Sequence, residues 1–253
     1  MTFFPRFRPQ ILGGMFAGLL LLGAAPAWAL LVQPVLIKMT SSGQSVTSII
    51  EVVNDRNRPI TVEIGVNRLT IPERGDVVRE PDAGDEFQIF PLQAIIPPGA
   101  RQTFRVRWVG DQALPQGKLY MFSTAELPVQ MEPGQTGVSL FYAVESVVAV
   151  SPLGASPDLS IVGVTRKTNT QGVAGLEVLF ANDGPAIGFV ADAELTLAVE
   201  GSPWSLTLQP SDLSNAFGLG VVPANGRRAM FLANADVPPQ GDVTARYKPR
   251  SAS

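Results

Sequence analysis

Short runs of alternating apolar and polar residues, separated by turn-forming residues, restrict most strongly what this sequence can fold into. The turns contain many of the 24 glycines and 22 prolines, and no long segment keeps the 3.6-residue period of a helix. Alternation with a period of two is typical of strands with one buried face. In the clearest run the apolar members are expected in the core and the basic members on the opposite side: Phe104, Val106 and Trp108 against Arg105 and Arg107. The sequence therefore predicts an all-β protein.

The predicted strands form two groups, which indicates two immunoglobulin-like β-sandwich domains. In the first group we expect strands at 35–39, 45–53, 60–69, 101–109, 118–125 and 138–150, and in the second at 159–164, 176–182, 193–199, 204–208, 227–233 and 242–247. The segment 152–157 contains small residues and two prolines, which is typical of a hinge. We therefore expect an N-terminal domain over 30–151 and a C-terminal domain over 158–253.

Residues 1–29 have the three-part pattern of a secretory signal peptide. Two arginines precede an uncharged apolar run of twelve residues, 11–22, and Ala27 and Ala29 supply the small residues that a signal peptidase recognises. The alternative is a membrane anchor, but the run is too short to cross about 30 Å of hydrocarbon at about 1.5 Å per residue. We expect cleavage after Ala29 and export of the remaining chain.

Charge and composition argue against several functional classes. Loss of two arginines with the signal peptide leaves 17 basic and 22 acidic residues, a net charge of −5, which makes nucleic acid and anionic membranes poor partners. The sequence has no histidine or cysteine, so Ser/His and Cys/His nucleophile pairs and most zinc sites are excluded. Gly218 and Gly220 favour a turn over a phosphate loop, and the acidic run 80–86 lacks calcium-ligand spacing. We expect no catalytic residue, no metal, no cofactor and no enzymatic activity.

The run 138–144 is the strongest candidate for a functional element. Because strand side chains alternate, one face of the run carries four apolar or aromatic side chains: Val138, Leu140, Tyr142 and Val144. An apolar edge strand is normally an aggregation hazard, so a protein that keeps one can use it to pair with a partner. The alternative interpretation is an ordinary core strand, since any sandwich strand has one buried face.

Several segments of residues 30–152 resemble the periplasmic chaperones of the chaperone–usher pilus pathway, the PapD-like family. The resemblance rests on the order and spacing of six segments, of which the third is similar to the family's proline–leucine–proline–glycine segment: 38–43, 48–55, 87–99, 102–108, 120–128 and 138–152. It is weaker beyond the predicted hinge. A signal peptide followed by two β-domains fits the same family.

The resemblance implies a chemistry of folding and not of catalysis. Pilin subunits of this pathway lack their last strand, and the chaperone donates a strand that fills the resulting apolar groove before delivery to an outer-membrane usher. Val138, Leu140 and Tyr142 match the donated positions, with Val144 behind them. The implied location is the periplasm and the implied partners are pilin subunits and an usher. Whether the free protein caps itself as a dimer stays open.

Family members also bind the terminal carboxylate of the pilin between two basic side chains in a cleft. Lys38 matches the first of these positions, where arginine is usual, and a lysine offers a point contact in place of a bidentate grip. Val147 stands at the second position and carries no charge. Lys38 is thus either a lone anchor or an ordinary surface lysine, and Arg105 and Arg107 are the alternative cations.

Two other functional classes share some of these sequence features. A secreted two-domain adhesive or pilus-associated binding protein would have the same predicted fold. A small outer-membrane barrel is disfavoured, because 22 prolines fit poorly with long membrane-spanning strands.

Overall fold

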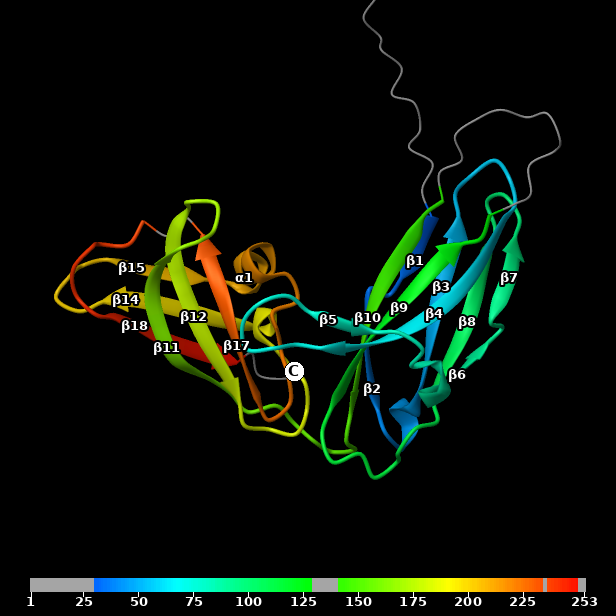
Figure 1. Ribbon diagram of the computed structural model, residues 1–253, viewed down its shortest axis with the longest axis horizontal. Helices are drawn as coiled ribbons and strands as arrows, with labels where there is room; N and C mark the ends of the chain where they lie inside the picture. The colour runs from blue at the N-terminus through cyan, green and yellow to red at the C-terminus, as the bar shows by residue number, and fades with distance from the viewer. Residues whose placement is uncertain (1–29, 129–140, 234–235, 250–253) are drawn as a thin grey trace, which may run out of the picture.

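The structure is a computed structural model that describes residues 30–128, 141–233 and 236–249. Two β-domains lie side by side at an angle, joined by one connection between β10 and β11, and a long hairpin of the first domain reaches toward the second (Figure 1). The first domain consists of β1 Leu30–Gln33, β2 Leu36–Thr40, β3 Thr47–Asn54, β4 Ile60–Thr70, β5 Val78–Glu80, β6 Phe87–Phe90, β7 Gln93–Ile96, β8 Arg101–Trp108, β9 Lys118–Glu126 and β10 Ala143–Ser151, with 3₁₀ turns at Gln44–Val46 and Gly84–Glu86. The second consists of β11 Leu159–Thr168, β12 Ala174–Asn182, β13 Gly188–Phe189, η3 Val190–Asp192, β14 Ala193–Val199, β15 Ser205–Leu208, α1 Pro210–Phe217, β16 Val221–Val222, β17 Gly226–Ala233 and β18 Val243–Pro249.

The first domain is a sandwich of two sheets. One sheet has the order β1-β3-β8-β6, and the other has the order β2-β10-β9-β4-β5, with β7 also paired to β4. The expected alternation on β8 is confirmed, since Phe104, Val106 and Trp108 are buried and the two arginines between them are exposed. Phe87 packs edge-on against Trp108, at 5.2 Å between ring centroids, and this aromatic cluster fills the space between the sheets.

The N-terminal segment of the first domain changes sheets. β1 pairs antiparallel with β3 in one sheet, whereas β2 pairs parallel with β10 in the other. Pro34 and Val35 make the crossing, and a proline is tolerated there because the position lies outside both ladders. On the edge opposite β9, β10 therefore has a neighbouring strand only where β2 reaches, from Leu36 onward.

The second domain has three small sheets, β11-β12-β17, β15-β14-β18 and the pair β13-β16. Its core contains Leu176, Phe180, Leu195 and Leu213, all fully buried. Helix α1 begins at Pro210, and the side chain of Asp212 accepts a hydrogen bond from the backbone N–H of Gln209, so that the first turn is capped.

The all-β fold with two domains is confirmed, and each run expected from alternation contains a strand. Two starts differ: the strand expected from 45 begins at Thr47, after the 3₁₀ turn Gln44–Val46, and the strand expected from 138 begins at Ala143, because 141–142 are not in a strand and 138–140 lie outside the described residues. The sequence prediction missed the short strands β1, β5, β6, β7, β13 and β16 and the helix α1. The predicted signal peptide, 1–29, lies outside the described residues. Within the described ranges no helix is long and apolar enough to cross a bilayer.

Candidate functional site: an open strand edge and an interdomain cleft

Residues 147–151 of β10, the closed half, lie inside the sheet. They pair with β2 on one side and with β9 on the other. Val148 and Val150 are fully buried in the core of the first domain, and the N–H of Val147 donates to the carbonyl of Val35 at 2.8 Å. Both backbone edges of this half are used within the domain.

Residues 143–146 of β10, the open half, pair on one side only. Their register partners are residues 122–125 of β9, and the described residues place no strand opposite. Backbone groups of successive strand residues point to alternate edges. Because the carbonyl of Tyr142 accepts from Glu126 at 2.9 Å, the N–H and C=O groups of Ala143 and Glu145 face away from β9. With respect to the described strands, this half therefore presents an unpaired edge.

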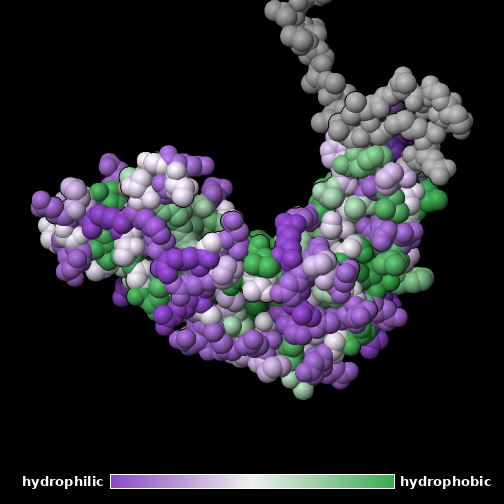
Figure 2. Space-filling model, in the orientation of Figure 1, coloured by the Kyte–Doolittle hydropathy of each residue, from purple (hydrophilic) through white to green (hydrophobic). Residues whose placement is uncertain are grey.

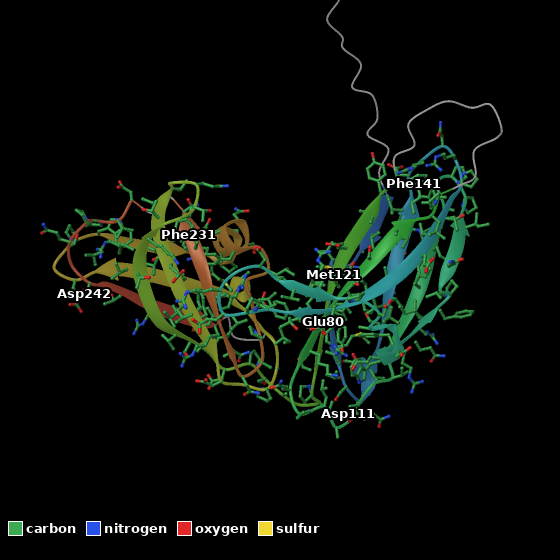
Figure 3. The ribbon with its side chains drawn as sticks, viewed as in Figure 1. Glu80, Asp111, Met121, Phe141, Phe231 and Asp242 are labelled. Carbon is green, nitrogen blue, oxygen red and sulfur yellow. The ribbon has the colours of Figure 1, made fainter. Side chains whose placement is uncertain are left out.

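Two exposed aromatic residues precede the open half, Tyr142 at 46% and Phe141 at 44% exposure, and neither belongs to β10. Phe141 lies at the end of the first domain remote from the second (Figure 3). Val144 is partly buried and packs against the core of the first domain. Val144 and Ser146 thus continue the core-facing side of the strand, and the exposed Tyr142 follows beyond its end. The predicted residues Val138 and Leu140 of this face lie outside the described residues.

A buried cluster of charged residues contacts the ring of Tyr142. The Glu126 side chain is 1% exposed and forms ion pairs with Arg56 at 2.9 Å and Arg58 at 2.5 Å. The Arg56 guanidinium also stacks over the Tyr142 ring, 4.7 Å from its centroid. Such a contact contributes about 0.5–2 kcal/mol. The cluster fixes the position of an otherwise solvent-exposed ring.

The second element of the candidate site is a cleft between the domains, visible as a hollow with apolar residues at its base (Figure 2). It contains a cavity of about 320 Å³ lined from both domains. Lys38 on β2 lies in its wall, donates to Asp192 at 3.0 Å and stands over the Phe189 ring at 4.5 Å from the centroid. Burial and the charge of Asp192 raise the pKa of Tyr247, another lining residue, to about 12.

The floor of the cleft is an apolar cluster shared by the two domains. Leu69, Leu119 and Ala149 of the first domain pack with Ile187 and Phe189 of the second. Val147 contacts this cluster, so the side chain at the expected second basic position packs between the domains. Arg105 and Arg107 are exposed on β8, which lies on the far side of the first domain, and neither lines the cavity (Figure 1). Of the three cations considered from the sequence, the structure places Lys38 in the cleft.

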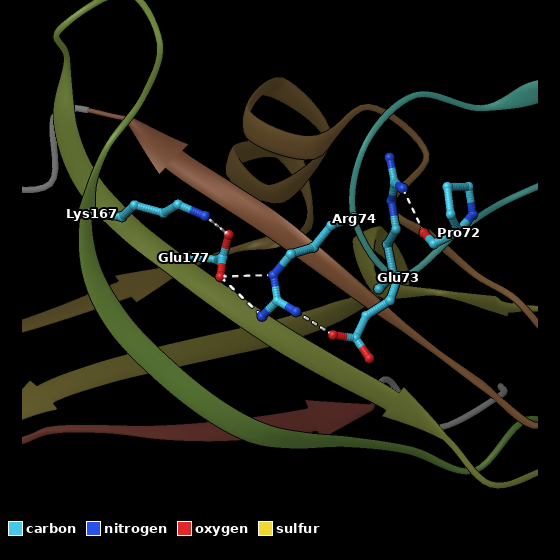
Figure 4. A network of polar contacts seen from close by, with 6 residues as sticks. Pro72, Glu73, Arg74, Lys167 and Glu177 are labelled. Atoms are coloured by element: carbon cyan, nitrogen blue, oxygen red, sulfur yellow. Dashed lines mark hydrogen bonds and ion pairs between the residues drawn. The ribbon is translucent and has the colours of Figure 1, made fainter.

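The β4–β5 hairpin crosses to the second domain and contacts the edge of β17. The N–H of Ala229 donates to the carbonyl of Glu73 at 2.8 Å, and Arg228 donates to the carbonyl of Pro72 at 2.7 Å (Figure 4). Arg74 pairs with Glu177 at 3.2 Å, and Lys167 completes the network at 2.5 Å (Figure 4). The hairpin therefore covers one sheet edge of the second domain and ties the domains on a second side of the cleft.

Comparisons with known proteins bear on the fold. No family model matches the sequence, and a search of curated proteins finds no match. The solved class 5 fimbriae chaperone CfaA superposes with a TM-score of 0.52 at 10% identity, covering 88% of this chain and 100% of that one. A chain from the Salmonella enterica SafA pilin complex with the SafB chaperone gives 0.51 at 16% identity, covering 83% and 87%. The CsuC–CsuE chaperone–tip adhesion subunit complex of Acinetobacter baumannii gives 0.51 at 14% identity, covering 86% and 97%.

The chain has the fold of the fimbrial chaperones. At these identities the likeness establishes the two-domain architecture along nearly the whole described chain, and the role of each side chain must be argued from its own surroundings.

The structure gives the positions of the described residues predicted for the site, and their roles stay predictions. Tyr142 and Val144 lie beside the unpaired edge, and Lys38 lies in the cleft. The ion cluster of Arg56 and Glu126 was missed, although Glu126 continues the inward alternation of β9, and a carboxylate at an inward position requires a partner. Within the described ranges, no group of three acidic residues gathers as a metal site would need.

Proposed function

We propose that this protein is a periplasmic chaperone that binds and caps pilin subunits by donating a β-strand, and delivers them to an outer-membrane usher. The observation that carries the proposal is the unpaired edge of the open half of β10, in a chain with the fold of the fimbrial chaperones. The solved relatives include complexes of a chaperone with a pilin and with a tip subunit. A subunit strand placed against Ala143 and Glu145 would satisfy their outward-facing backbone groups.

Side chains would add affinity to these backbone hydrogen bonds. Val138, Leu140, Tyr142 and Val144 are the proposed inserted residues. Val144 already packs against the core of the first domain, so if each of the other three buries about 100 Å² of apolar surface at ~25 cal/mol/Å², they contribute about 7.5 kcal/mol before ordering costs. A contribution of this size holds a subunit and still permits strand exchange at an assembly platform.

Lys38 is the proposed contact for the terminal carboxylate of the subunit. It is the cation of the cavity lining, and its side chain is 54% exposed and therefore accessible. With Val147 in the apolar floor, the anchor has one cation and forms a point contact. We expect Lys38→Met to weaken subunit binding without removing it.

Capture of the subunit from the periplasm tests the proposal. The tagged protein is expressed in its own source organism, and the co-purified partner is identified by mass spectrometry. We expect a one-to-one soluble complex with a pilin, which is lost in the double variant Leu140→Asp, Tyr142→Asp. Phe141→Asp is the matched control for the single variant Tyr142→Asp, because it adds the same charge at a neighbouring side chain of similar exposure that alternation assigns to the other face, and it should leave capture unchanged.

The outcomes separate the proposal from its alternative. Equal pilin capture by the double variant would contradict strand donation. Capture of a host-surface ligand in place of a pilin would favour a secreted adhesive with the same two-domain fold.

A further inference from the structure

Lys38 already has an anionic partner in the free protein. Its Nζ atom lies 3.0 Å from Oδ2 of Asp192, which belongs to the second domain. Both side chains are more than half exposed, at 54% and 67%, so water and dissolved ions reach them. Asp192 thus occupies the ammonium group of Lys38, at which a bound carboxylate would be held.

The described residues that line the cavity have no excess positive charge. Lys38 is the cation and Asp192 the anion, while Tyr247 and Ser151 contribute neutral polar groups. A carboxylate that approaches the cavity is therefore attracted by Lys38 and repelled by Asp192 over similar distances. Because the two carboxylates would repel each other at one ammonium group, Lys38 holds a charged partner more strongly when Asp192 gives up its contact.

We propose that Asp192 is an internal competitor that occupies Lys38 in the free protein and is displaced by the carboxylate of a bound subunit. The inference rests on the proposed function for the identity of that carboxylate. It assigns Asp192 the role of a specificity residue, because the residue sets how strongly the cleft favours carboxylate-terminated partners. Exposed ion pairs contribute up to about 1 kcal/mol, so removal of the competitor should strengthen carboxylate binding about fivefold.

Acetate is a suitable probe, since it presents the same functional group without the rest of a subunit. Amide NMR shifts of residues 38 and 189 are followed as acetate replaces chloride at constant ionic strength and pH 7. Four proteins are compared: wild type, Asp192→Asn, Lys38→Met and the double variant. Glu200→Gln is the control, because it removes one negative charge from an exposed position of the second domain that does not line the cavity.

We expect Asp192→Asn to bind acetate about fivefold more strongly than wild type, Glu200→Gln to match wild type, and both proteins with Lys38→Met to give no response. Unchanged or weaker binding by Asp192→Asn would overturn the inference. The same gain in the Lys38→Met background would also overturn it, because the effect would then not act through Lys38.

The same variants keep this inference separate from the proposed function. In subunit capture, Asp192→Asn should retain more pilin than wild type after a salt wash. If Asp192→Asn binds acetate more strongly as expected but no protein captures a pilin, the proposed function is wrong, whereas the competition between Asp192 and a carboxylate for Lys38 still holds. If the protein captures a pilin but Asp192→Asn binds acetate as wild type does, the proposed function holds and the competition by Asp192 is wrong.

Discussion

The closed and open halves of β10 belong to one strand and are both rich in small and β-branched residues, yet they differ in what lies beside them. The closed half lies between β2 and β9, whereas the open half has β9 alone. The cause is the change of sheets between β1 and β2, which removes a neighbour from residues 143–146. The difference shows that topology, and not composition, leaves an edge available to a partner.

The largest expected effect contrasts a charge in the closed half with one next to the open half. Val150→Asp places a carboxylate at a fully buried position of the closed half, and we expect a loss of at least about 4 kcal/mol of unfolding free energy. Tyr142→Asp, next to the open half, changes a half-exposed side chain and removes its contact with Arg56, so it should cost about 2 kcal/mol or less. Urea unfolding measures both. Equal losses would mean that the halves do not differ in packing.

The next effect concerns the ion cluster beneath the open half. Glu126→Gln leaves the buried guanidinium of Arg56 without a counter-charge, and we expect a loss of about 3 kcal/mol. Arg56→Met in the same chain should restore part of this stability, because it removes the unpaired charge. If the double variant is no more stable than Glu126→Gln, the pair does not act as a unit.

The third effect is a dependence of stability on pH, and it concerns residues that pair with the closed half. Partial burial disfavours the Glu86 carboxylate, but hydrogen bonds from Lys118, Tyr120 and Arg68 lower its pKa to about 2. Lys118 and Tyr120 are the register partners of Val150 and Val148.

Because the folded-state pKa of Glu86 is depressed, its stabilising contribution is complete above the unfolded value of about 4.3 and is lost as pH falls toward 2. We therefore expect Glu86→Gln to be less stable than wild type at pH 7 and nearly equal to it at pH 2. Urea unfolding at the two pH values checks this. A constant difference between the proteins would contradict the assigned ionisation.

Alternation along the sequence predicted most of the fold, because it reports directly which face of a strand is buried. Phe104, Val106 and Trp108 illustrate this. Short elements were missed because two to four residues cannot show a period, and the eight-residue helix α1 spans barely two turns.

Alternation along one segment is enough to select Tyr142 and Val144 as candidates, although Tyr142 precedes β10 and the roles of both stay predictions. The candidate site was not predictable where distant segments meet. Asp192 lies 154 residues from Lys38, and Arg56 lies 70 residues from Glu126, so only the fold brings each pair together.

The smallest expected change in stability gives the most direct test of the open edge. Ala143→Pro removes a backbone N–H that faces away from β9, and proline is tolerated at such edge positions. We expect a loss of less than about 1 kcal/mol in unfolding free energy but a clear drop in pilin capture, since a donor to the incoming strand is gone. Val144→Pro is the matched control, because the N–H of Val144 faces β9 and its loss should cost about 3 kcal/mol. Undiminished capture by Ala143→Pro would mean that the subunit does not pair with this edge, even if the fold and the cleft are as described.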